Sequence, residues 1–248
     1  MRLLSAILIV IITSSFSYSQ IVNIESKRVR REGDGWSGES GVEFFILKEV
    51  STVYAASGNI QLQMKKDRSL LLFLSEFSFL KADDQDFSNA GFQHIRYNYK
   101  VSELMRWEAF TQAQFNKIRD VKLRALIGTG PRVKLYDTDL MRFYLASLYM
   151  YEYEERQNER VFDRTHRLSS YLSYTFDIGK MLFFGTIYHQ PNLQDFSDYR
   201  ISFQTDLEFE VFEALDFVIK YKLLYDTKPP PGVPNTSYQI SNGLILEL

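Results

Sequence analysis

Residues 198 to 226 contain the longest regular alternation of apolar and polar side chains in the chain. Between Tyr199 and Val211 every second residue is apolar or threonine, and the residues between them are charged or otherwise polar. The alternation resumes from Phe217 to Tyr225 after a short reversal. A period of two residues is typical of strands with one apolar and one polar face. The stretch therefore predicts a β-hairpin with strands at 198–211 and 216–225.

The predicted strands are long. Strands in globular proteins commonly have about 5 to 6 residues, whereas a tilted strand needs about 9 to 11 to cross a bilayer. Similar patterns recur along the chain, although 69–80 is apolar on both faces apart from Glu76. They predict about twelve strands, an even number as in bacterial outer-membrane barrels. The expected bounds are 39–48, 54–65, 69–80, 89–101, 104–116, 122–136, 140–153, 164–176, 181–190, 198–211, 216–225 and 236–248.

The connections between these strands alternate in length. We expect short turns at 66–68, 102–103, 137–139, 177–180 and 213–215. Longer and more polar connections are expected at 81–88, 154–163, 191–197 and 226–235, with 49–53 and 116–121 as brief exceptions. Short turns at one end and longer loops at the other are typical of outer-membrane barrels. The predicted fold is therefore all-β, a closed antiparallel up-and-down transmembrane β-barrel of residues 39–248.

The first 19 residues differ from the rest. Arg2 precedes an apolar run at 3–12, and the small residues Ser17 and Ser19 follow it. This order is typical of a secretory signal peptide, and we expect cleavage before Gln20. Residues 20–38 contain a basic cluster without a clear period, and we expect an irregular N-terminal arm there. The signal predicts export, here to the outer membrane of a Gram-negative bacterium.

Composition narrows the function further. The chain has 16 tyrosines and 20 phenylalanines, yet its mean hydropathy is −0.22. Strands that present one face to lipid and one to a wet interior account for both values. A formal charge of −2 provides no field for nucleic acid, and the absence of cysteine excludes disulfides, thiolate metal sites and a cysteine nucleophile. We predict no metal site and no cofactor.

Three segments in the C-terminal part carry a family resemblance: YEYEER at 151–156, HQPNLQDFSDYR at 189–200 and YDTKPPPGVPNTS at 225–237. The last of them is the most specific. Together they resemble an uncharacterised family of outer-membrane β-barrel proteins named for induction by salt, over residues 40–248. The resemblance implies a small barrel without an established activity. Two positions depart from the family pattern: Leu248 ends the chain where an aromatic residue is common, and Ser237 stands where an acid is frequent.

The three segments fall at the same predicted end of the barrel. Their polar residues predict a ring around one mouth, formed by Tyr151, Glu152, Asp198, Arg200 and Asp226. This ring is a candidate site for a ligand at the rim. The structural alternative is that Arg200 only pairs with Asp226 across the hairpin.

Charged residues at the polar positions of the strands are expected to point into the lumen. The candidates are Arg96, Arg106, Glu108, Glu208 and Lys220. Because both signs are present, these side chains could pair and close the lumen, or line a narrow diffusion pore for a small solute. A lumen of about twelve strands lies between the filled and the aqueous types, so both alternatives stay open.

Two further classes of protein compete with the barrel. An exported soluble β-sandwich or lipocalin-like binding module would pack the tyrosine face in a core. An outer-membrane hydrolase would need a histidine beside a nucleophile, and His94, His166 and His189 are the only histidines. The predicted protein is a monomer and not an enzyme, and its partners are outer-membrane lipid and the barrel-assembly machinery.

Overall fold

The computed structural model describes residues 33–48, 52–82, 85–157, 162–212 and 215–246, which form one twelve-stranded sheet. Each strand pairs in antiparallel fashion with its neighbours in the sequence, so the order in the sheet runs from β1 to β12. This arrangement confirms the predicted all-β, up-and-down class. The strands are β1 (Gly35–Lys48), β2 (Thr52–Lys66), β3 (Ser69–Ala82), β4 (Gln85–Lys100), β5 (Met105–Asn116), β6 (Val121–Asp137), β7 (Met141–Arg156), β8 (Phe162–Ile178), β9 (Met181–Pro191), β10 (Tyr199–Phe212), β11 (Leu215–Asp226) and β12 (Thr236–Leu246).

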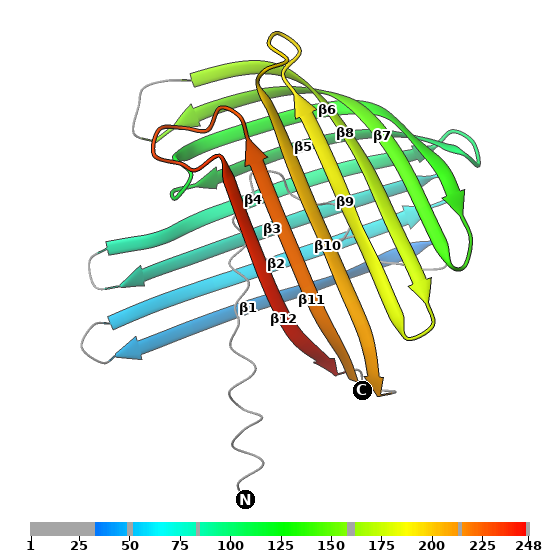
Figure 1. Cartoon of the computed structure of the whole chain (residues 1–248), viewed down its shortest axis with the longest axis horizontal. Coiled ribbons are helices and arrows are strands. Elements are labelled where there is room, and N and C mark those ends of the chain that lie inside the picture. Colours follow the sequence, from blue (N-terminus) through cyan, green and yellow to red (C-terminus); the bar gives the residue numbers. More distant parts are fainter. Residues whose placement is uncertain (1–32, 49–51, 83–84, 158–161, 213–214, 247–248) are drawn as a thin grey trace, which may run out of the picture.

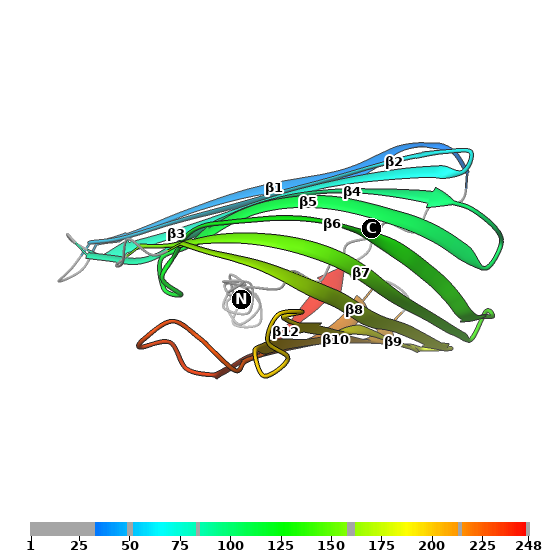
Figure 2. The same ribbon diagram turned by 90° about the horizontal axis from the view of Figure 1, so that it is seen from above.

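The sheet is strongly twisted and rolled. The strands β1 to β4 run at a steep angle to β9 to β12 (Figure 1). Seen from above, the sheet bends round through β6 to β8, so that β1 to β5 and β9 to β12 form two facing walls (Figure 2). Right-handed twist accumulates from strand to strand and produces this curvature. Among the described strand pairs none joins β1 to β12, so the predicted closure is not part of the observed pairing.

Alternate connections lie at the same end of the sheet. The turn end carries the tight connections, such as Asp67–Arg68 between β2 and β3 and Gly179–Lys180 between β8 and β9. Asp67 and Gly179 have positive φ angles of 51° and 62°, which two-residue hairpin turns require. The loop end carries the other connections, including 192–198 and 227–235.

Several predicted boundaries are wrong because the strands run further than expected. β1 begins at Gly35, inside the predicted irregular arm, and β3 and β4 leave only 83–84 of the predicted connection at 81–88. Polar residues pair in a backbone ladder as readily as apolar ones, so a change in side-chain polarity does not mark the end of a strand. Of the four longer connections, only 191–197 and 226–235 correspond closely to loops. The predicted signal peptide and Leu248 lie outside the described residues.

The two faces of the sheet have inverted polarity. On β4, Ile95 and Tyr97 are 44% and 42% exposed, while Arg96 between them is 3% exposed. The same alternation holds on β5, where Trp107 is exposed and Glu108 is fully buried. We call the concave face that carries the buried polar side chains the inner face. The aromatic and aliphatic side chains on the opposite, outer face point away from it.

Part of the inner face is apolar. A cluster on β5, β7, β8, β9 and β11 fills the bend of the sheet, and it consists of Phe110, Ala146, Leu148, Met150, Tyr171, Tyr188 and Leu224. Gly130 on β6 permits close contact here, because a Cβ atom at this position would lie 2.3 Å from the Ser147 carbonyl oxygen. No helix in the described part of the chain has the length and apolar character needed to cross a membrane.

Candidate functional site: the polar inner face

A buried ionic cluster occupies the inner face near the loop end. Its centre is Arg200 on β10, whose Nη1 donates to Glu152 Oε1 at 2.7 Å and whose Nε donates to Asp226 Oδ2 at 2.9 Å. Arg200 also lies 3.5 Å from Glu154. All four residues are 7% exposed or less. We call this group of ion-paired residues the rim cluster, and it joins β7, β10 and β11.

Two more arginines belong to the rim cluster. One is on β8, which lies between β7 and β10, and the other is on β6, the neighbour of β7. Arg167 on β8 donates from Nη2 to both carboxylate oxygens of Asp198, at 3.0 and 2.9 Å, and its Nε lies 3.3 Å from Glu152 Oε2. Arg124 on β6 donates to Glu154 and lies 3.5 Å from Glu152. Buried charges require such partners, because removal from water costs several kcal/mol per ion. The cluster thus holds three arginines against four carboxylates.

Four of the five predicted rim residues meet in this cluster, and Tyr151 does not. Tyr151 alternates with Glu152 on β7, so its ring points to the outer face, where it lies 5.3 Å from the ring of His166. The period of two separates neighbours onto opposite faces, which contradicts the placement of Tyr151 in the ring. The predicted pairing of Arg200 with Asp226 is present. Arg124 and Arg167, which sequence reasoning did not place at the rim, belong to it because β6 and β8 flank β7.

Further side-chain contacts join the connections at the loop end to one another and to β12. Arg119, in the connection between β5 and β6, donates to the Ser237 hydroxyl on β12 at 2.6 Å. Burial lowers the pKa of Arg119 to about 10, and the nearby Asp226 carboxylate counteracts this effect. Lys228 donates to Asp195 at 2.5 Å and links the two longest loops. This contact and two hydrogen bonds from Ser197 lower the pKa of Asp195 to about 2.

A second polar group lies deeper on the inner face. Arg96 on β4 donates to Glu108 Oε2 at 2.9 Å, and the Tyr171 hydroxyl donates to the same oxygen at 2.8 Å. Arg132 on β6 lies 3.9 Å from Glu108 Oε1. Because Tyr171 is on β8, this contact reaches across the bend of the sheet from β5. With the rim cluster and the apolar cluster, these residues fill the space enclosed by β5 to β10.

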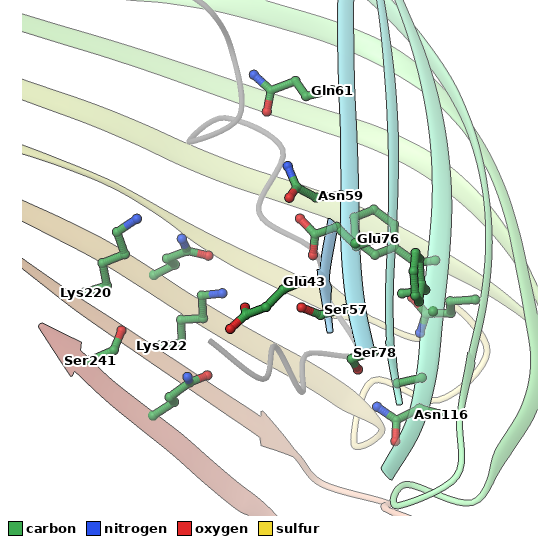
Figure 3. A pocket seen from close by; sticks show the side chains of 18 of the residues that line it. Glu43, Ser57, Asn59, Gln61, Glu76, Ser78, Asn116, Lys220, Lys222 and Ser241 are labelled. Carbon is green, nitrogen blue, oxygen red and sulfur yellow. The ribbon is translucent and has the colours of Figure 1, made fainter. Parts of the chain in front are cut away.

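The remaining part of the inner face is hollow. A polar cavity of about 510 Å³ lies between the wall of β1 to β5 and the wall of β10 to β12. Figure 3 shows Glu43 and Ser57 on one wall and Lys220 and Lys222 on the other, with their side chains directed into the space between. Eight further lining residues carry amides or hydroxyls, while Phe77, Phe92 and Phe115 add apolar surface; the eight are Asn59, Gln61, Ser78, Gln114, Asn116, Gln204, Gln239 and Ser241.

The five predicted lumen charges divide between these surroundings. Arg96 and Glu108 are buried in the deep polar group, and Lys220 lines the cavity. Arg106 and Glu208 are half-buried near the turn end. Glu43 also lines the cavity, although sequence reasoning did not select it. The signal was available, since Glu39, Gly41 and Glu43 occupy one parity of β1 and Val42, Phe44 and Ile46 the other.

The histidines are distributed over both faces. On the inner face, His94 Nδ1 lies 2.9 Å from Gln112 Oε1, and its other ring nitrogen accepts from Arg96. His166 contacts the Tyr149 hydroxyl on the outer face, and His189 lies against the ring of Tyr199. The His94 ring also stacks on Phe110, with the ring centroids 5.5 Å apart. No group of three residues suited to hold a metal ion occurs in the described part of the chain.

The fold places the chain among proteins with porin-like β-sheets. It is similar to the NanC porin, with 12% sequence identity and a TM-score of 0.50 over 78% of this chain and 94% of that one. A structure of the KdgM porin has 11% identity and a TM-score of 0.46, over 80% of this chain and 99% of the other. At this identity the likeness to NanC supports the fold alone.

The sequence itself determines the family. The family model described as "Protein of unknown function, DUF481" matches residues 51–247, so the chain belongs to that family. This confirms the resemblance to an uncharacterised family. None of the curated proteins matches the sequence of this chain.

Proposed function

We propose that this protein is an outer-membrane β-barrel that passes small polar solutes through its interior. The observation that carries the proposal is the inverted polarity of the sheet. Large apolar side chains such as Trp107 and Ile127 are exposed on the outer face, whereas Arg96, Glu108 and Arg124 are buried inside. Burying charge while exposing apolar surface is unfavourable in water and favourable in a bilayer.

The aromatic residues of the outer face support a membrane location. Trp107, Phe143, Phe176, Phe183 and Phe209 lie toward the turn end, and Tyr151, Tyr153, Phe162, Tyr199 and Tyr225 toward the loop end. Tyr199 and Phe209 on β10 are separated by ten positions, which at about 3.3 Å per residue and a tilt of about 40° gives about 25 Å. This distance matches the apolar band of outer-membrane barrels, which two aromatic girdles flank.

Closure of the sheet follows from the same location. Lipid cannot satisfy the backbone groups of an unpaired strand edge, so in a membrane β1 must pair with β12. An even number of strands makes this final pairing antiparallel, like the others. The inner faces of β1 and β12 both contribute to the cavity, through Glu43 and Ser241 for example. Closure therefore turns the cavity into an enclosed passage.

The path for solutes runs through this cavity. The space enclosed by β5 to β10 is filled by the rim cluster, the apolar cluster and the deep polar group. The cavity instead lies between β1 to β5 and β10 to β12, and most of its lining residues are polar. The sequence left open whether paired charges close the lumen or line a narrow pore. A partly filled interior combines the two, since paired charges close one side while a narrow passage remains on the other. The sandwich alternative has no support, because the interior carries charged side chains.

Purified protein tests both parts of the proposal. A closed barrel in detergent migrates faster on a gel before boiling than after it, and its reconstitution into planar bilayers should give discrete conductance steps. Equal migration under both conditions, with recovery of the protein in the soluble exported fraction, would exclude the barrel. Heat-modifiable protein that gives no conductance and admits no solute into liposomes would exclude the passage while leaving the barrel in place.

A further inference from the structure

The two walls of the cavity carry charges of opposite sign. On the wall of β1 to β3, Glu43 and Glu76 line the space, and Glu39 extends the acidic row along β1. Neighbouring inward positions on these strands are uncharged: Asn59 pairs in register with Glu76, and Ser57 with Glu43. This wall therefore presents carboxylates set among amides and hydroxyls.

The opposite wall presents amines. Lys220 and Lys222 occupy successive inward positions of β11. Asp206 lies opposite Lys220 in the register of β10 and β11, but it is 5% exposed whereas Lys220 is exposed. Asp206 also lines the cavity, so this wall carries two lysines against one carboxylate, and Lys220 is the more exposed member of the register pair. On β12, the register partners of Lys220 and Lys222 are the uncharged Ser241 and Gln239.

We propose that the cavity is a binding site for small zwitterionic solutes of the amino-acid type, which it orients across the passage. This inference rests on the proposed passage and names its class of solute. An ammonium group faces Glu43 and Glu76 while a carboxylate faces Lys220 and Lys222. The amides and hydroxyls between the charged groups supply hydrogen bonds to the rest of the solute. A simple anion or cation is attracted by one wall and repelled by the other, whereas a zwitterion gains from both.

The field that makes this selection is short-ranged. Charges across an aqueous lumen are screened over about 10 Å at 0.1 M salt, so the effect is confined to the cavity. Within about 4 Å, a unit charge in water changes the local concentration of an ion by roughly fivefold. The preference should therefore be of this order, and it should decrease at high ionic strength.

Liposome swelling with two isomeric solutes tests the inference. β-Alanine is zwitterionic and its isomer lactamide is uncharged, so their size and composition are matched. The wild-type protein should admit β-alanine faster than lactamide, by roughly fivefold. Neutralising either wall, with Lys220→Gln plus Lys222→Gln or with Glu43→Gln plus Glu76→Gln, should bring the ratio of the two rates close to one.

The two double variants should differ in their preference for simple ions. In planar bilayers with a KCl gradient, the lysine variant should shift toward potassium by roughly fivefold and the glutamate variant toward chloride by a similar factor. Lys180→Gln and Glu103→Gln are matched controls, because both side chains are exposed at the turn end. Neither control should change the solute ratio. Heat-modifiable migration checks folding. If a double variant does not fold, Lys220→Gln alone replaces the lysine pair and Glu43→Gln alone replaces the glutamate pair.

The outcomes separate this inference from the function on which it rests. Entry of both solutes at equal rates in wild-type protein, or a ratio that neither wall variant changes, overturns the zwitterion site and leaves the passage standing. Exclusion of both solutes by folded wild-type protein overturns the passage, and the zwitterion site with it. A shift in the same direction for both double variants would also contradict the inference, since opposed walls require opposite shifts.

Discussion

Arg200 Nη1 lies 2.7 Å from Glu152 Oε1, although β8 and β9 separate their strands in the sheet. Two side chains can span that separation only where the sheet is strongly curved. The contact therefore ties the bend of the sheet to the rim cluster. Charge pairing at the rim and curvature of the backbone depend on each other.

Loss of Arg200 should destabilise the protein strongly. Arg200→Gln leaves Asp226 and Glu152 buried without their nearest cation, and breaking a buried pair commonly costs about 3 to 5 kcal/mol. The midpoint of urea unfolding, followed by the gel shift of unboiled samples, should fall accordingly. Lys122→Gln removes the half-exposed ion pair between Lys122 on β6 and Glu155 on β7 and should cost at most about 1 kcal/mol. Equal effects of the two substitutions would show that the rim cluster is not a determinant of stability.

Gly130 should not tolerate a side chain. A Cβ atom there would lie 2.3 Å from the Ser147 carbonyl oxygen and 2.7 Å from Leu148 Cα. Backbone atoms cannot move aside cheaply, so Gly130→Ala should cost about 1 to 3 kcal/mol through overpacking. Gly243→Ala on β12 is the control, because a Cβ atom there meets nothing within 4 Å. Unfolding midpoints of both variants provide the comparison, and a neutral Gly130→Ala would contradict the tight contact of β6 with β7.

Cysteine pairs on β1 and β12 should report closure of the sheet. The chain contains no cysteine, so a pair introduced on the outer face, such as Val42→Cys with Ile240→Cys, gives an unambiguous signal. Disulfides form between Cα atoms about 4.4 to 6.8 Å apart, so a scan of neighbouring outward positions on β12 covers the unknown register. One register should crosslink within the monomer. Crosslinks found only between two chains would replace closure by pairing of strand edges in an oligomer.

The loop contact between Asp195 and Lys228 should persist except in strong acid. The pKa of Asp195 is lowered from 3.8 to about 2, so the charged form is favoured in the folded state. Any stabilisation from this contact is complete above pH 4 and is lost as the pH falls through about 2. An NMR titration of the Asp195 carboxyl carbon in micelles measures this directly. Lys228→Gln should move the midpoint upward, and an unchanged midpoint would assign the shift to Ser197 alone.

Much of the fold is readable in the sequence, for reasons visible in particular strands. The alternation in β10 and β11 predicted which of their residues share a face. Arg200 and Asp226, both on the polar face, are register partners in the structure. β3 was harder to interpret, because Leu72 and Leu74 are buried on the inner face while Phe73 between them is also apolar. Strand ends were misplaced at 81–88, since polarity changes there while the pairing of β3 with β4 continues to Ala82 and Gln85 through a register shift after Leu80.

The candidate site was predictable only in part. Four residues of the site were predictable because each has an inward position near the loop end of a strand, and both properties follow from the local sequence. They are Glu152, Asp198, Arg200 and Asp226. Arg167 joins them through the curvature of the sheet.

The sequence by itself determined which side chains share a face, because a period of two is a local property of an extended backbone. It also determined the number and direction of the strands and the membership of the family. Only the tertiary structure decided which parts of the inner face touch and which stay apart. Twist and rolling bring β7 against β10 but leave a polar cavity between β1 and β11, and the degree of rolling depends on pairings summed over the whole sheet.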